Sequence, residues 1–453
     1  MGKNKNHRRA LKVDDFTDDD TLSTTSTGSS VDFGRGEVEE EQDEGTVLDG
    51  FIEALYEKRA ATRENGLRGL IGALTSNVLS DFVDEKYETL LHLFLVSIKR
   101  GSAIERALAA RAIGLLALTA GPGDIADLIM NDAWPQLVKS AKTDSSSATR
   151  VSTLDAMGIV PFVSDTELET TENAMAVLWQ ICSHKGNYHS DQVLGTNRPS
   201  GSVKAAAILS WALLLSTVPS TRIAGHYVAL GLPTLSYLLK GDDLAVRKAA
   251  GEAVALLYET SKDLLEDSDL RLGEISDNPA LAVPGPQPTH KLAASAGKGL
   301  EAKEVEVVER MKALSVQAGG KGQSKKERYA ERASFKEYLT NIEDGVCREI
   351  SLKLQGGDFL TINTWTHTIQ LNALRRVLAE GFQRHLQGNE LLHEIFQFQP
   401  RGQKRQTLSS KEKRLYMSPN SVISKARTQT RNRSRSLVQA GNEGHFNVNS
   451  DDA

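Results

Sequence analysis

An internal repeat of about 43 residues is the feature that most constrains this chain. It appears between about Val47 and Ser261 when the sequence is aligned on a basic residue near the start of every second predicted helix. The aligned cations follow one another at intervals of 43, 44, 54 and 43 residues, and they are Arg63, Arg106, Arg150, Lys204 and Arg247. The longest interval contains a polar insertion of about ten residues between Gly186 and Arg198.

Each unit of this repeat has the pattern of a helix pair. Apolar residues recur at helical spacing, and in four of the five units a small residue follows the cation by eight positions. These small residues are Gly114, Gly158, Ala212 and Ala255. A period near 43 residues is typical of HEAT and armadillo repeats, whose apolar stripes are buried only when repeats stack. The sequence therefore predicts a mainly α-helical protein, with a curved right-handed α-solenoid of about ten helices in five pairs over residues 46–262.

Composition divides the rest of the chain into four segments. Residues 1–45 hold almost no aromatic or branched apolar side chains and are predicted to be a disordered acidic head. Residues 263–326 contain clustered prolines and glycines and are predicted to be a linker. Residues 327–400 combine helical patterns with a β-hairpin pattern, which predicts a small α+β C-terminal module. Residues 401–453 are predicted to be a basic, largely disordered tail.

The formal net charge of −5 hides a strong segregation of charge. Residues 13–50 hold 13 acids and one base, whereas residues 401–436 hold 11 bases and one acid. The first twelve residues add a charge of +5, so everything else carries −8. The sequence therefore predicts that binding to nucleic acid is confined to the tail, and that the acidic head occupies the tail until RNA displaces it.

Eight bases of the tail are the predicted contacts to RNA or the ribosome: Lys411, Lys413, Arg414, Lys425, Arg427, Arg431, Arg433 and Arg435. A segment of one sign of charge binds phosphate backbones by counterion release, and arginine-rich segments commonly fold on RNA. Two alternatives remain open at this point: the tail is only a nuclear import signal, or it has no partner at all.

The five aligned cations also have two interpretations. A cation near a helix N-terminus opposes the helix macrodipole and needs a carboxylate or a ligand beside it. In the first interpretation Arg63, Arg106, Arg150, Lys204 and Arg247 form structural pairs between adjacent repeats. In the second they form a protein-binding face on the concave side of the solenoid.

Nothing in the sequence points to catalysis, a metal or a cofactor. The two cysteines, Cys182 and Cys347, are too few for a disulfide framework. Cys182, His184 and His189 lack a fourth ligand at zinc spacing, and a thiol–base pair of Cys347 with His367 or His385 has no local support. The longest apolar stretches are too short to span a membrane. We expect a non-enzymatic protein of the cytoplasm or nucleus, with no membrane and no small-molecule substrate among its partners.

Four stretches of the chain resemble the interferon-related developmental regulator family. The first two are the acidic head with the following helix and the repeats up to Ser261. The third is Phe382–Leu392, FQRHLQGNELL, which is similar to a family signature of a helix, a turn and a second helix. The fourth is the basic terminal motif, at Lys413–Tyr416 and Ser424–Thr428.

This resemblance implies an armadillo-like domain, a family C-terminal domain and a non-enzymatic regulator of gene expression. Family members are described in two ways. One is as factors on translationally inactive ribosomes, with the basic C-terminal segment in RNA-lined channels. The other is as nuclear co-regulators of transcription that act through corepressor and deacetylase complexes. The composition of the tail favours the ribosomal role.

Overall fold

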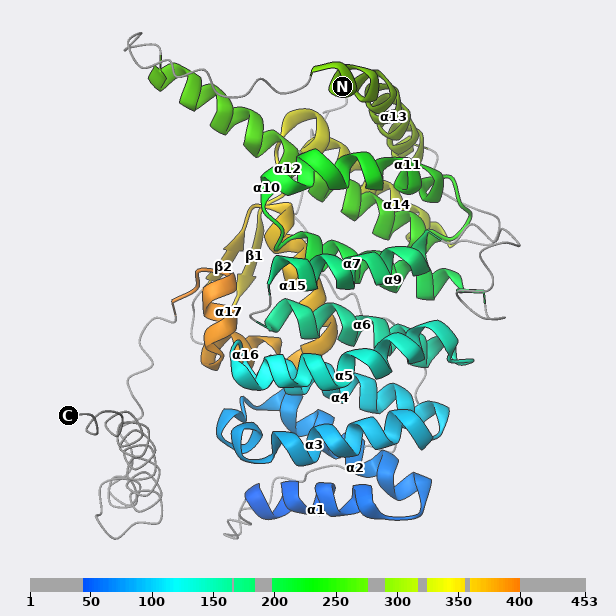
Figure 1. Ribbon diagram of the computed structural model, residues 1–453, viewed down its shortest axis with the longest axis vertical. Helices are drawn as coiled ribbons and strands as arrows, with labels where there is room; N and C mark the ends of the chain where they lie inside the picture. The colour runs from blue at the N-terminus through cyan, green and yellow to red at the C-terminus, as the bar shows by residue number, and fades with distance from the viewer. Residues whose placement is uncertain are drawn as a thin grey trace, which may run out of the picture. The chain divides into compact units, whose positions relative to one another are not determined.

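Pairs of antiparallel helices stack on one another along most of the chain (Figure 1). The computed structural model describes residues 44–164, 167–183, 198–275, 290–316, 324–354 and 359–399. The residues from Gly45 onward belong to one compact unit. No helix in these described ranges is both long enough and apolar enough to cross a membrane.

Five of the pairs match the predicted repeats. The first helices of the pairs are α1 (Glu44–Tyr56), α3 (Ser80–Arg100), α5 (Asp124–Thr143), α7 (Leu168–Cys182) and the broken helix α10–η1–α11 (Ser220–Arg222, Ile223–Tyr227 and Val228–Leu239). The second helices are α2 (Ala60–Ser76), α4 (Ala103–Ala120), α6 (Ser147–Val163), α9 (Gly201–Leu215) and α12 (Leu244–Ile275). The predicted α-solenoid of armadillo type is therefore confirmed.

Four of the five second helices begin with a side-chain cap that recurs with the repeat, whereas α2 begins after Arg59 without one. The side chains of Ser102, Ser146 and Ser200 each accept a hydrogen bond from the backbone N–H three residues on. Asp243 does the same at the start of α12. Such a side chain satisfies a backbone donor that the first helical turn leaves free. The aligned cation follows the cap by four residues, which explains why it recurs at one place in each unit.

Small residues bring neighbouring second helices together, as the sequence predicts. A Cβ atom at Gly158 would lie 2.9 Å from that of Ser210, so only glycine permits this approach of α6 to α9. Around these contacts α4, α6 and α9 are buried on nearly all sides. Trp211 of α9 is fully buried, and its ring centroid lies 4.7 Å from that of Trp179 in α7. The core therefore lies between the two layers of helices.

A sixth helix pair joins a helix in the segment predicted to be a linker to the first helix of the predicted C-terminal module. It consists of α13 (His290–Val316) and α14 (Lys325–Asp344), which contact α11 and α12 respectively. Val307, Met311 and Leu314 bury one face of α13. The predicted boundaries at 263 and 326 differ from this arrangement, because an apolar face that follows a proline-rich stretch can still pack onto the preceding repeat.

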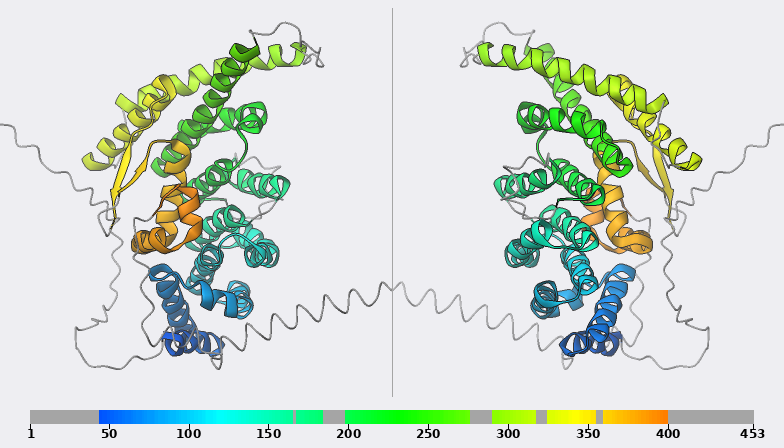
Figure 2. Two further views of the ribbon diagram at one scale, coloured as in Figure 1. Left: turned by 90° about the vertical axis from the view of Figure 1, so that its left-hand side faces the viewer. Right: turned by 90° about the vertical axis from the view of Figure 1, so that its right-hand side faces the viewer.

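The C-terminal elements predicted for residues 327–400 are present. Strands β1 (Ile350–Lys353) and β2 (Phe359–Ile362) pair antiparallel, with Ile350 opposite Ile362. Three short helices follow: α15 (Trp365–Leu378), α16 (Phe382–Gly388) and α17 (Glu390–Ile395), with the 3₁₀ turn Ala379–Gly381 before α16. They do not form a separate body. Figure 2 shows them alongside the second helices of the solenoid, with which α15 and α16 are in contact.

Candidate functional site

The second helices of the solenoid form its inner face, and the C-terminal helices cover it. Contacts begin at α12, where the carboxylate of Glu259 accepts hydrogen bonds from the backbone N–H groups of Trp365 (2.7 Å) and Thr366 (2.9 Å). A carboxylate at this place caps the N-terminus of α15 and interacts favourably with the positive end of the helix dipole. The register of α15 on the solenoid is thus set at its first turn.

Farther along α15, the contacts move to α9, α6 and α4. Gln370 donates to Ser216 Oγ at 3.1 Å, and Arg376 Nε lies 2.9 Å from Asp155 Oδ1. Arg111 donates to the carbonyl oxygen of Val377 at 3.2 Å. Burial raises the pKa of Asp155, and the charges of Arg376 and Arg111 oppose that rise. The polar groups that the inner face would offer to a partner are therefore engaged within the chain.

The last contacts reach α2 and α4, at the other end of the solenoid. The ring Nε2 of His385 lies 2.9 Å from the carbonyl oxygen of Leu74, and Arg384 donates to the carbonyl oxygen of Ser76 at 2.8 Å. Asn389 donates to the carbonyl oxygen of Leu118 at 3.0 Å, while its own Oδ1 caps α17. Residues 365–389 thus run along the inner face from α12 back to α2.

The buried His385 makes this contact sensitive to pH. Burial lowers the pKa of His385 below its ordinary value of 6.5, so the folded state holds a neutral imidazole. Its contribution to stability is present above pH 6.5 and is lost as the pH falls through the lowered pKa. As the pH falls, we expect the unfolding free energy of the parent protein to decrease relative to that of the variant His385→Gln. The full decrease is about 1.4 kcal/mol for each unit by which burial lowers the pKa of His385.

Urea unfolding of both proteins from pH 8 to pH 5 measures this difference directly. Other titrating groups are common to the two proteins and cancel. A difference that stays constant over this range contradicts a buried neutral histidine.

The aligned cations join neighbouring repeats in the solenoid. Arg63 Nε lies 2.8 Å from Glu105 Oε1, and Arg106 Nε lies 2.6 Å from Asp144 Oδ2. Burial raises the pKa of Glu105, but the charge and hydrogen bond of Arg63, together with hydrogen bonds from Ser97 and Ser102, bring the net shift of that pKa downward. Arg247 of α12 pairs with Glu331 of α14 in the same manner, at 2.6 Å. These contacts favour the structural interpretation of the cations.

The same arginines also satisfy carbonyl groups at the ends of the first helices. Arg63 donates to the carbonyls of Glu57 and Lys58, and Arg106 to that of Gly101. Corresponding bonds run from Arg150 to Ala141 and from Arg247 to Gly241 and Asp242. The last carbonyls of a helix have no partner within it, and cations suit the negative end of its dipole.

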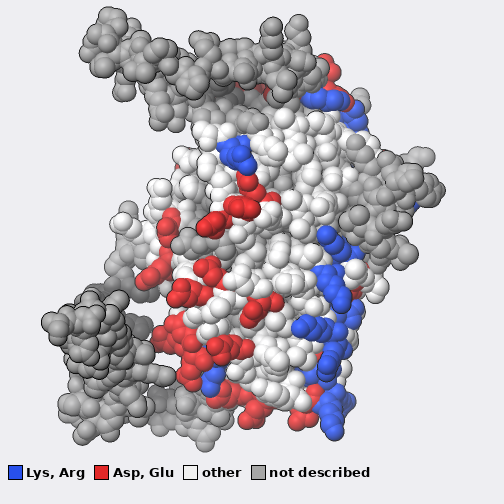
Figure 3. All heavy atoms as spheres, in the orientation of Figure 1, with Lys and Arg blue, Asp and Glu red and all other residues white. Residues whose placement is uncertain are grey.

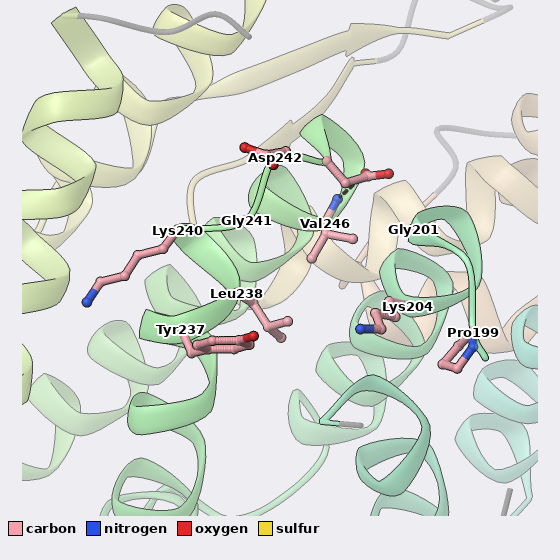
Figure 4. A pocket seen from close by; sticks show the side chains of 10 residues that line it. Pro199, Gly201, Lys204, Tyr237, Leu238, Lys240, Gly241, Asp242 and Val246 are labelled. Carbon is pink, nitrogen blue, oxygen red and sulfur yellow. Dashed lines mark hydrogen bonds between the residues drawn. The ribbon is translucent and has the colours of Figure 1, made fainter. Parts of the chain in front are cut away.

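The five cations differ in how much of each side chain is exposed to a possible partner. Arg150 is 2% exposed and Arg247 is 5% exposed, so both offer almost no surface to a partner protein. Lys204 instead lines an open cavity of about 350 Å³, together with Pro199, Tyr237 and Lys240 (Figure 4). A binding face built from all five cations stays a prediction, and their geometry supports it less than the structural interpretation.

The sequence reasoning missed the sixth member of this series. Ser324 caps α14 and forms a reciprocal capping box with Glu327, and Arg328 follows the cap by four residues. Arg328 therefore corresponds to the five aligned cations, although the segment preceding α14 interrupts the 43-residue spacing. The order Ser-x-x-Glu-Arg, present at 102–106 and again at 324–328, is the signal that could have found it.

The remaining predicted site residues are the bases of the tail and the cysteine and histidine candidates. All eight bases of the tail, together with His184 and His189, lie outside the described residues. Among the described residues no group of three or more His, Cys, Asp or Glu side chains could hold a metal ion. Burial raises the pKa of the Cys182 thiol to about 12 and that of Cys347 to about 11, so neither is a thiolate at neutral pH.

Comparison with known families decides the identity of the chain. The profile of the interferon-related developmental regulator family matches residues 19–343, and a second profile, the interferon-related protein conserved region, matches residues 389–439. The chain belongs to the interferon-related developmental regulator family. Interferon-related developmental regulator 2 of Mus musculus is 30% identical over 411 residues, which cover 88% of this chain and 85% of the mouse protein.

A second relative and a solved structure are similar to this family member as well. Interferon-related developmental regulator 1 of Homo sapiens is 25% identical over 441 residues, covering 93% of this chain and 90% of the human protein. Among solved structures, a designed armadillo repeat protein aligns with a TM-score of 0.37 and 14% identity, over 64% of this chain and 99% of that one.

The segment Phe382–Leu392, which resembles a family signature, makes the contact with α2 and α4. Arg384, His385 and Asn389 within Phe382–Leu392 each bond to a carbonyl group near the end of α2 or α4. This segment therefore contains the residues that hold the C-terminal helices against the first two repeats.

Proposed function

We propose that this family member is a non-enzymatic regulator of gene expression that binds ribosomal RNA through its basic tail and restrains translation. The observation that carries the proposal is the concentration of 11 bases and one acid in residues 401–436. With six to ten phosphate contacts, such a segment loses about 10³–10⁵ in affinity between 50 and 200 mM salt. Ribosomes, in the cytoplasm or assembling in the nucleus, offer rRNA phosphates at high density.

The fold supports this proposal by giving the tail a fixed starting point. Phe398 is 8% exposed, and its backbone N–H donates to the carbonyl oxygen of His393 at 2.9 Å. Residues 396–399 line a cavity together with Phe359, Leu360 and Thr361 of β2. The chain that enters the tail is thus held against the solenoid through α15, α16 and α17. A tail bound to RNA would hold the whole folded body on the ribosome.

A non-catalytic role is supported by the chemistry of the described side chains. The thiols of the buried Cys182 and the half-buried Cys347 have raised pKa values, which makes them poor nucleophiles. On the inner face, the carboxylate of Asp155 is occupied by Arg376 of the same chain. An α-solenoid commonly supplies a binding surface in place of a reaction centre.

Replacing all eight predicted tail contacts by glutamine tests the proposal in a chain of full length. We expect the parent to co-sediment with ribosomes and to slow translation in a cell-free system, and both effects to weaken with salt. The slope of log affinity against log salt should fall by roughly 0.7 for each lost phosphate contact, because fewer counterions are released. The eight-fold substitution should abolish most binding at 150 mM salt.

A permuted tail provides the control, since it keeps the eight bases but changes their order within residues 411–435. Binding by counterion release depends on charge more than on order, so the permuted chain should sediment with ribosomes as the parent does. Equal sedimentation of the glutamine variant and the parent would show that the tail is not the anchor.

The alternative is a transcriptional co-regulator that holds corepressor or chromatin proteins on the inner face. That role requires the C-terminal helices to leave the face, because Glu259, Ser216 and Asp155 bond to them. Crosslinking of the intact protein in cells distinguishes the two roles. Recovery of rRNA supports the ribosomal proposal, whereas recovery of chromatin regulators without rRNA supports the alternative.

A further inference from the structure

The charges of the solenoid are sorted between the two ends of its first helices. Acids gather at the helix starts, among them Asp81, Asp84 and Glu85 in α3, Asp124 and Asp127 in α5, and Glu169 in α7. Bases gather at the other ends, where loops lead to the second helices. Figure 3 shows Lys and Arg along the right-hand edge and Asp and Glu toward the opposite side. The small net charge of the folded body therefore conceals two surfaces of opposite sign.

We call the surface at the ends of α3 and α5 the basic edge, defined by Lys99, Arg100, Lys139 and Lys142. Lys99, Arg100 and Lys139 are exposed, and Lys142 is half-buried. None of the four forms an ion pair with any carboxylate in the described ranges. Lys142 donates a hydrogen bond to the neutral side chain of Gln180 at 3.4 Å, so the charges of all four lack a carboxylate partner in these ranges.

The acids of the same two loops do not neutralise the basic edge. Residues 96–107 contain one acid, Glu105, and residues 136–152 contain one, Asp144. Their side chains are only 2% and 6% exposed, and they pair with Arg63 and Arg106 respectively. The arginines of the repeat thus hold these two acids in ion pairs below the surface. The exposed charges of the two loops are therefore those of the lysines and Arg100.

The basic edge continues into neighbouring repeats. Lys58 and Arg59 are exposed in the loop between α1 and α2, and Arg198 is exposed just before α9. Farther along, Lys204 and Lys240 line the cavity of Figure 4 at the corresponding ends of α9 and α11, where Lys240 forms an ion pair with Glu306 of α13. Cations therefore recur at this side in successive repeats, at the spacing that helix stacking imposes.

Helix dipoles alone do not account for this surface. Each loop joins the C-terminus of a first helix to the N-terminus of a second, so partial charges of opposite sign lie beside each other. The dipoles favour Lys99, Arg100 and Lys142, which lie in the last turns of α3 and α5. Lys139, however, precedes the last turn of α5, and Lys58 and Arg59 follow the end of α1. Unpaired like charges along one edge repel one another, and an anionic partner removes that repulsion.

We propose that the basic edge is a second RNA-binding surface, which contacts the phosphate backbone of structured RNA while the acidic ends of the first helices face away from it. The inference rests on the proposed function in that it takes ribosomal RNA as the partner. The exposed hydroxyl of Ser145, beside the cations, suits phosphate oxygens. No aromatic side chain lies in either loop, residues 99–103 or 139–147, so the surface would read backbone and shape without stacking on bases.

The test uses the chain of full length with the quadruple substitution Lys99→Gln, Arg100→Gln, Lys139→Gln and Lys142→Gln. A matched control removes three exposed bases and one half-buried base away from the edge: Lys336→Gln, Arg348→Gln and Lys353→Gln with the half-buried Lys86→Gln. Each set is also built into the chain with the eight tail substitutions. The probes are a 20-base-pair RNA duplex and purified ribosomes, measured from 50 to 200 mM salt, and equal thermal unfolding confirms that the variants fold.

We expect the edge substitution to lower the salt slope by roughly 3, about 0.7–0.9 for each contact, and to weaken duplex binding at least about tenfold at 50 mM salt. The control set should change neither. In the tail-substituted chain the remaining duplex binding should depend on the edge alone.

Three outcomes would overturn the proposal. In the first, edge and control sets change duplex binding equally. In the second, the tail-substituted chain does not bind the duplex at 50 mM salt. In the third, the edge matters for ribosomes but not for the duplex, which indicates contact with a ribosomal protein. Edge-dependent duplex binding by a chain that never sediments with ribosomes supports the RNA surface and contradicts the ribosomal function, so the two failures are distinguishable.

Discussion

Replacing Glu331 by alanine is expected to destabilise the folded protein by about 3–5 kcal/mol, the usual effect of leaving a buried charge without its partner. Glu331 is fully buried in α14, and its Oε1 lies 2.6 Å from Arg247 Nη2 and 2.8 Å from Arg247 Nε. Arg247 keeps its bonds to the carbonyls of Gly241 and Asp242, which favours the lower part of that range.

An exposed pair in the same helix gives the matched control. Glu337 of α14 pairs with Arg348 at 2.7 Å, but the two side chains are 36% and 66% exposed. Exposed pairs contribute about 0–1 kcal/mol, so Glu337→Ala should change stability little. Urea unfolding followed by circular dichroism measures both variants. Equal effects of the two substitutions would mean that the contact between α12 and α14 does not depend on the buried pair.

The second large effect is expected at Gly381, where the C-terminal helices approach α2 most closely. A Cβ atom at this position would lie 1.8 Å from the backbone carbonyl oxygen of Thr75, so Gly381→Ala requires α16 or α2 to move. Overpacking of this kind typically costs about 1–3 kcal/mol and occasionally more. Because the obstacle is backbone, we expect α16 and α17 to leave α2, not to adjust in place.

Hydrogen exchange of the backbone amides reports this release. Residues 379–395 and the end of α2 should exchange faster in Gly381→Ala, while α9 and α12 remain protected. Gly72→Ala is the control in α2, since no atom lies within 4 Å of the added Cβ. That change should stabilise the helix by roughly 0.5–1 kcal/mol. Unchanged exchange in residues 379–395 of Gly381→Ala would contradict close docking of these helices.

The repeat and its helix pairs could be predicted from sequence because their determinants are local. The cap at Ser102, the cation at Arg106 and the small residue at Gly114 lie within one helix, and their recurrence defines the next. The β-hairpin was predictable for the same reason, since alternation in Ile350–Leu354 reports a strand directly. The sixth pair was missed because residues 262–323 interrupt the spacing that made the others visible.

The candidate sites were predictable only in part. The partners of the cations lie 42 residues away for Arg63 and 84 residues away for Arg247, and no local pattern specifies them. The cover over the inner face joins residues still farther apart, up to 311 for His385 and Leu74. Such contacts depend on which surfaces stacking brings together, so the sequence predicted a C-terminal module but not its location along the second helices.

By itself, then, the sequence determined the α-solenoid, its five pairs, the family and the concentration of positive charge in the tail, all of which depend on neighbouring residues or on composition. Only the tertiary structure decided that the C-terminal helices cover the inner face and that the charges of the folded body divide between two edges. The physical reason is that a stacked repeat aligns residues about 40 positions apart, such as Lys99 and Lys139. The net charge of the chain does not report this alignment, because it adds acids and bases from both sides of the stack. A partner that approaches one side contacts only the charges of that side.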